Sequence, residues 1–218
     1  MKKTILITFA IISLNYVHAQ VEKGSTLIGG SVNFNTNKSE ISANNYTKSS
    51  SWNISPQVGK AIKTNAIVGI QLNAGAIIND YRPLGVPLST KTTVNNYGLG
   101  VFYRQYYPLS GKWMLFGDGS IGGTISNGNT KSNDIKAANI KGWSASLNIM
   151  PGITYRVGKK VWLEAALNNL ANISYSSQKT ENLSTTGEVQ STNKQTSFGA
   201  NASISGLKDI AIGLRWIL

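Results

Sequence analysis

Hydrophobic side chains alternate with small or polar ones along residues 97–123, YGLGVFYRQYYPLSGKWMLFGDGSIGG. Before the turn at 108–112, aromatic and aliphatic residues take most odd positions, and the even ones include Phe102 and Arg104. After the turn the apolar residues are again mostly odd, while Asp118 and Ser120 are even. Because alternate side chains of a strand point to opposite faces, this stretch predicts a β-hairpin with one apolar face and one small, polar face.

The same alternation predicts eight strands along the chain. We expect them at 26–35, 51–60, 66–77, 97–107, 113–125, 141–156, 161–175 and 198–218, the last with a kink near Ser205 and Gly206. Pro56 and Pro151 fall inside strands, so each should lie at a bulge or at a position without a ladder hydrogen bond.

The connections between these strands alternate in length. Short turns follow strands two, four and six, at 61–65, 109–112 and 158–160. Long polar loops follow strands one, three, five and seven, at 36–50, 78–92, 126–139 and 176–195. In an up-and-down array all short turns then lie at one end, as in outer-membrane barrels. The pattern predicts an all-β fold, a closed eight-stranded antiparallel up-and-down transmembrane barrel with long extracellular loops.

Aromatic residues indicate which face meets lipid, because they gather near both ends of the predicted apolar face. Ten residues of a strand at about 3.3 Å each, tilted by about 40°, span roughly 25 Å, the height of an apolar band. A soluble barrel with an aromatic core is the alternative, but the strands carry little Lys or Glu for a solvent face. The expected membrane-interface aromatics are Phe34, Trp52, Tyr97, Trp143, Tyr175 and Phe198 at the long-loop end, and Tyr107, Trp113, Tyr155 and Trp216 at the short-turn end.

The N-terminus predicts export. Lys2 and Lys3 precede an apolar run, and Val17-His18-Ala19 forms a small-residue cleavage site, so residues 1–19 are interpreted as a signal peptide and 20–218 as the barrel domain. Cleavage lowers the formal net charge from +12 to +10 and removes the chain's one histidine.

Chemistry is restricted by the missing residue types. The chain has no Cys, and without His18 the mature chain offers no His base, no Ser-His or Cys-His nucleophile and no thiolate or imidazole metal site. We expect no catalytic residue, no metal and no cofactor. Scattered basic residues do not form a nucleic-acid motif. The strand positions that face away from the apolar side should point into the lumen. They predict a network of charged residues there: Arg104, Asp118, Arg156, Glu164 and Arg215.

The chain resembles the small outer-membrane β-barrel domain proteins, the porin-family proteins with OmpA/OmpX-like barrels. The resemblance rests on GVFYRQYYPL at 100–109, LFGD at 115–118, LEA at 163–165 and the closing strand. Gly213, Trp216 and Leu218 also match the C-terminal assembly signal of such proteins. The resemblance implies insertion by the barrel-assembly machinery into the cell outer membrane, contact with lipid and lipopolysaccharide, and a monomer.

Three functions remain open from the sequence. The first is a non-enzymatic integral outer-membrane protein with a structural or surface-interaction role. The second is a narrow channel for small solutes, and the third is a secreted soluble ligand-binding barrel. The inward side chains are bulky and of mixed charge, and an eight-stranded barrel is only wide enough for side chains, so the sequence favours a plugged lumen.

Overall fold

The computed structural model describes residues 20–42, 45–83, 88–167, 170–202 and 210–218. The predicted signal peptide and the predicted kink at Ser205 and Gly206 lie outside these residues. No helix in the described part of the chain is long and apolar enough to cross a membrane. The strands are β1 (Thr26–Ser42), β2 (Asn45–Lys63), β3 (Ala66–Arg82), β4 (Thr90–Ser110), β5 (Trp113–Ser132), β6 (Ile135–Arg156), β7 (Val161–Leu167), β8 (Ala171–Leu183), β9 (Val189–Ala202) and β10 (Ile210–Ile217).

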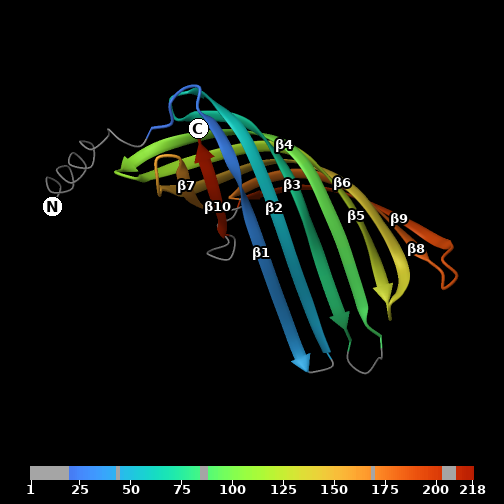
Figure 1. The fold of residues 1–218 in the computed structure, drawn as a ribbon. Helices are drawn as coiled ribbons and strands as arrows, with labels where there is room; N and C mark the ends of the chain where they lie inside the picture. Colours follow the sequence, from blue (N-terminus) through green and yellow to red (C-terminus); the bar gives the residue numbers. More distant parts are fainter. Residues whose placement is uncertain (1–19, 43–44, 84–87, 168–169, 203–209) are drawn as a thin grey trace, which may run out of the picture.

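Eight strands form a ring at the end of the molecule that carries the short turns (Figure 1). Each of β1 to β6 pairs antiparallel with the next strand, and β10 joins β7 to β1. The closing ladder runs from the pair Leu27 and Ile217 to the pair Val32 and Ile212. The predicted all-β, antiparallel up-and-down barrel is therefore confirmed.

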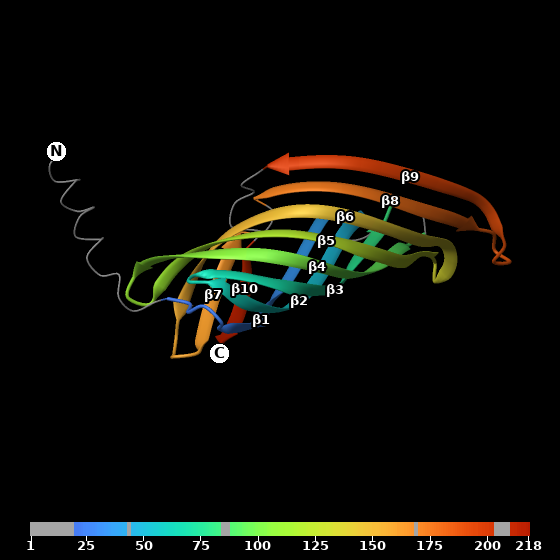
Figure 2. The ribbon, with the colours of Figure 1, turned by 90° about the horizontal axis from the view of Figure 1, so that it is seen from above.

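The last two predicted strands are each divided into two elements, β7 and β8, and β9 and β10. The edge of β6 pairs with β8 from Ala138 to Ile149 and with β7 from Gly152 to Arg156. In the described residues β9 pairs with β8 and with no other strand. The β8–β9 hairpin therefore continues the sheet away from β1 instead of meeting it (Figures 1 and 2).

Each of the two strand prolines lies where the ladder on one of its edges is interrupted, while the ladder on the other edge continues and pairs Pro56 with Gly30 and Pro151 with Gly117. Pro151 falls between the part of β6 that pairs with β8 and the part that pairs with β7. Pairing between β2 and β3 pauses from Ile54 to Gln57 without a change of register, and Pro56 lies in that interval. Proline has no N–H to donate, so both positions avoid a lost ladder bond, as expected.

The prediction of long loops is wrong for most of their length, because the strands continue through them. The hairpins β1–β2, β3–β4, β5–β6 and β8–β9 extend the ladders with small polar residues. Cross-strand hydroxyl and amide contacts support these extensions, for example Thr92 with Thr130 at 3.0 Å. The β5–β6 turn is the two residues Asn133 and Asp134, both with positive φ, which suits a tight hairpin. These segments lack the apolar alternation by which strands are found in a sequence, and backbone pairing does not require it.

Side-chain orientation follows the predicted parity. Along β4, Tyr97, Leu99, Val101 and Tyr103 are exposed on the outside, whereas the alternate residues point inward. Glycines of neighbouring strands make room for inward aromatics: a Cβ on Gly69 would lie 2.6 Å from a ring carbon of Phe102. The barrel thus has an apolar exterior and a filled interior near the short turns.

Candidate functional site in the barrel lumen

An apolar layer closes the lumen at the short-turn end. Its residues are Val21, Leu27, Ala61, Ile67, Phe102, Tyr106, Met114, Phe116, Trp162 and Ala166, all buried. Val21 comes from the segment before β1, which folds across this end: its N–H donates to Asn65 Oδ1 at 2.8 Å, and the Asn65 N–H donates to its carbonyl at 2.9 Å. The chain therefore covers the bottom of its own barrel. The alternation of strand residues gave no indication of this segment.

A layer of charged side chains lies against the apolar layer, centred on Arg104 of β4. Arg104 Nε and Nη2 donate to Asp118 Oδ2 at 3.0 and 2.6 Å. Its Nη1 donates to both carboxylate oxygens of Glu164, at 2.8 and 3.0 Å. Arg104 and Asp118 face each other because they are register partners on β4 and β5. One guanidinium thus joins carboxylates from β5 and β7 across the lumen.

Arg215 of β10 completes this charged layer, with its Nη2 3.1 Å from Glu164 Oε2. Arg104, Asp118, Glu164 and Arg215 are each at most 5% exposed. Two positive and two negative groups balance, which is what burial of charge requires. Arg156, predicted as a fifth member, is only half-buried, and none of the ion pairs found in the described residues includes it. The structure brings four of the five predicted residues together.

Aromatic residues hold the central guanidinium from the apolar side. The Arg104 Cζ atom lies 4.4 Å from the centroid of the Phe116 ring, a cation–π distance. Tyr106 donates its hydroxyl hydrogen to Glu164 Oε1 at 3.3 Å and packs edge-on against Trp162 at 5.5 Å. Tyr106 and Phe116 were not among the predicted lumen residues, although their even positions share the parity of Arg104 and Asp118. The parity of the strand was the signal that could have found them.

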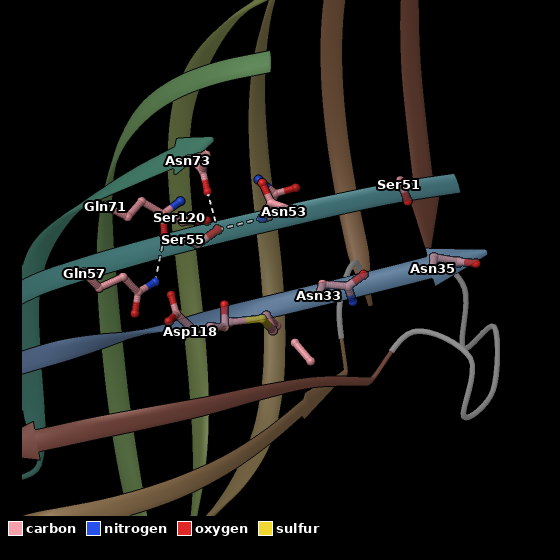
Figure 3. A pocket seen from close by; sticks show the side chains of 14 residues that line it. Asn33, Asn35, Ser51, Asn53, Ser55, Gln57, Gln71, Asn73, Asp118 and Ser120 are labelled. Carbon is pink, nitrogen blue, oxygen red and sulfur yellow. Dashed lines mark hydrogen bonds between the residues drawn. The ribbon is translucent and has the colours of Figure 1, made fainter. Parts of the chain in front are cut away.

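A polar cavity of about 420 Å³ lies above the charged layer, toward the hairpin extensions. Its walls come mainly from β1, β2 and β3, and β5 contributes Asp118 and Ser120 (Figure 3). Asn148 and Met150 of β6 also line it. Most of its lining side chains are amides and hydroxyls. The lumen therefore changes from apolar to charged to neutral polar from the short turns upward.

Eight of the ten predicted interface aromatics lie on the outside of the ring, whereas Tyr175 and Phe198 lie on the β8–β9 hairpin, which is not part of the ring. At the extension end all six are exposed, from Trp52 at 42% to Phe34 at 77%. At the short-turn end Trp113 packs against Tyr155 at 4.6 Å, and Tyr155 is half-buried. On β4 the outward side chains between Tyr97 and Tyr107 include Leu99 and Val101, both more than half exposed. An apolar belt about ten residues tall therefore surrounds a lumen that buries four charges.

The C-terminal residues take part in closing the ring. Thr26 and Leu218 exchange two backbone hydrogen bonds, at 2.7 and 2.8 Å. Trp216 faces outward, and Gly213 lies beside the charged layer, since a Cβ there would be 3.5 Å from Glu164 Oε2. The predicted assembly signal thus coincides with the last strand of the ring.

The exterior of this barrel is apolar with aromatic rims, and above the apolar layer its lumen is charged and polar. This distribution is the reverse of that in a soluble barrel and defines the class of transmembrane β-barrels. No family model matches the chain. No curated protein matches it.

Several solved structures show a distant likeness, among them the following three. Neisserial surface protein A is 13% identical, with 91% of this chain and 99% of that chain covered and a TM-score of 0.40. The translocator domain of the autotransporter NalP from Neisseria meningitidis is 11% identical, with 99% of this chain and 95% of that chain covered and a TM-score of 0.41. A major outer membrane protein from Thermus thermophilus is 13% identical, with 92% of this chain and 100% of that chain covered and a TM-score of 0.41. The class rests on the strand pairing and the side-chain distribution of the chain itself.

Proposed function

We propose that the chain is an integral outer-membrane β-barrel protein with a non-enzymatic, structural or surface-interaction role. The observation that carries this proposal is the inversion of polarity between belt and lumen. In water, exposed side chains such as Leu99, Val101 and Ile121 would form an apolar surface far larger than a monomeric soluble protein shows. In a bilayer the same surface meets hydrocarbon. The secreted soluble barrel is therefore disfavoured.

The charged and apolar layers support a structural role over transport. Arg104 bridges two strands across the lumen, and Val21, Phe116 and Trp162 fill the space below it. A solute that passed would have to separate buried ion pairs and displace the segment before β1. The narrow channel is therefore the less favoured alternative.

The hairpin extensions supply a surface for contacts outside the cell. They carry lysines, among them Lys48, Lys91, Lys131 and Lys136, which suit the anionic groups of lipopolysaccharide. We propose that this rim contacts lipopolysaccharide, that residues 1–19 are removed on export, that the barrel-assembly machinery inserts the chain through its closing strand, and that the inserted protein is a monomer.

Two measurements test the proposal. Cell fractionation followed by heat-modifiable gel migration should find a folded barrel in the outer membrane. Recovery of the folded protein as a soluble species would contradict the membrane assignment. In planar bilayers the refolded protein should show no steady conductance, whereas a stable open channel would favour the transport alternative.

A further inference from the structure

The polar cavity above the charged layer has the composition of a binding site. We will call it the lumen cup, defined by Asn33, Asn53, Gln57, Gln71, Asn73 and Ser120 together with the other residues that line it. Among the lining residues, Asp118 is the only charged one, and its carboxylate is held by Arg104. The cup is thus a neutral chamber of amides and hydroxyls.

One buried amide oxygen at the cup, Oε1 of Gln57, lacks a hydrogen-bond partner in the described residues. Gln57 is 6% exposed and donates from Nε2 to Gln71 Oε1 at 2.9 Å, but no donor within the described residues reaches its own Oε1. A buried polar atom without a hydrogen bond costs free energy, so native proteins seldom leave one unless water or a ligand serves it. Figure 3 shows Gln57 and Gln71 on the wall of the cup. This oxygen is itself covered, so it can accept a hydroxyl or amide hydrogen of a ligand only when the Gln57 side chain turns toward the cup.

A second row of amides is already aligned in the same wall. Asn53 Nδ2 donates to Ser55 Oγ at 2.8 Å, and Ser55 Oγ donates to Asn73 Oδ1 at 2.7 Å. These contacts hold the side chains of β2 and β3 in place before any ligand arrives. Preorganised amides present donors and acceptors at fixed positions, which suits a molecule with several adjacent hydroxyl groups.

We propose that the lumen cup binds a small neutral polyhydroxylated ligand of the monosaccharide or disaccharide class. A charged ligand would lose its hydration without gaining a free counter-charge, because the carboxylate in the wall is already paired. The 14 lining residues include no aromatic side chain on which a sugar ring could stack, so binding is weak, with a dissociation constant of about 1 mM. This proposal rests on the lumen and not on the outer-membrane location.

The test uses the full mature chain refolded in detergent micelles and titrated with glucose and maltose, with glucuronate and glucosamine as charged counterparts. Binding is followed by calorimetry and by amide shifts in NMR spectra. Gln57→Leu should weaken sugar binding at least about tenfold. Ser120→Phe should abolish it by filling the cup. Gln178→Leu, an equivalent change on the β8 extension, should bind as the parent does.

The sugar titrations of the parent and the variants decide for or against the proposal. Binding of the neutral sugars that is lost on Ser120→Phe and kept on Gln178→Leu supports the proposal. It is overturned if neither sugar binds, if the charged counterparts bind equally well, or if Ser120→Phe leaves binding unchanged. Heat-modifiable migration shows that each variant is folded, and if Gln57→Leu does not fold, the decision rests on Ser120→Phe. Failure here leaves the membrane assignment untouched, because that assignment is tested by fractionation.

Discussion

Neutralising Glu164 should destabilise the barrel more than neutralising Asp118. Glu164 accepts two hydrogen bonds from Arg104 and one from Tyr106, and it also pairs with Arg215. Asp118 has only Arg104 as its ion-pair partner in the described residues, and Arg104 retains Glu164 when Asp118 is changed. Either substitution leaves one positive charge in excess, but only the change at Glu164 leaves a guanidinium, that of Arg215, without an ion-pair partner in the described residues.

The magnitude follows from these contacts. Glu164→Gln removes the acidic partner of Arg215 and one of the two partners of Arg104, so we expect a loss of about 3–5 kcal/mol in the free energy of unfolding. Asp118→Asn weakens two charge-assisted bonds to a guanidinium that remains paired, so we expect about 1.5–3 kcal/mol. Both variants keep the volume of the side chain, which limits effects of packing.

The assay is denaturant unfolding of the protein refolded into lipid vesicles, followed by the loss of strand signal in circular dichroism. Glu181→Gln serves as the matched control. Glu181 lies on the β8 extension, and the hydrogen bond and charge of Lys179 lower its pKa. This variant should unfold like the parent. Equal stability of Glu164→Gln and the parent, or a larger loss for Asp118→Asn, would refute the reasoning.

Three further outcomes are expected. An epitope tag at 133–134 should be accessible from outside intact cells and one at Gly111 should not; the opposite result would reverse the orientation. Deletion of 216–218 should leave the protein in the periplasm, and a truncated protein that still migrates as a folded barrel in the outer membrane would remove the role of these residues in insertion. Gly152→Ala should lower stability because its Cβ would collide with the Phe116 ring, whereas Gly117→Ala, with open space around it, should be tolerated; equal denaturation midpoints would contradict this packing.

Strand parity was sufficient to predict the ring and the inward position of the charged residues. A strict period of two places Arg104, Asp118, Glu164 and Arg215 on one face, and antiparallel closure brings those positions together. The alternation of side chains does not give the position of a residue along the barrel axis relative to residues of strands that are not adjacent. It therefore did not show that Arg156 lies apart from the other four charged residues. The half-buried position of Arg156 depends on its place near the end of β6, beside the turn to β7.

Two other features could not be read from the alternation. The extensions are strands without an apolar face, stabilised by backbone pairing and by contacts such as Ser49 Oγ donating to Asn79 Oδ1 at 2.8 Å. Their composition is that of solvated loops, so the sequence favours the wrong state. The segment containing Val21 is too short to show any period, and its burial depends on the cavity that the finished ring provides.

Six residue pairs join β1 to β10, and the formation of this ladder affects the rate of folding. The other neighbours in the ring, except β7 and β10, are consecutive in the chain and can pair as local hairpins. The ladder between β1 and β10 joins the two ends of the barrel domain, so it carries the largest loop-closure entropy and raises the contact order. Until β10 arrives, one edge of β1 has no partner strand, and unpaired backbone groups are expensive in hydrocarbon. Ring closure is therefore the step that should limit the rate of folding, and substitutions confined to β10 should slow folding while leaving the earlier hairpins intact.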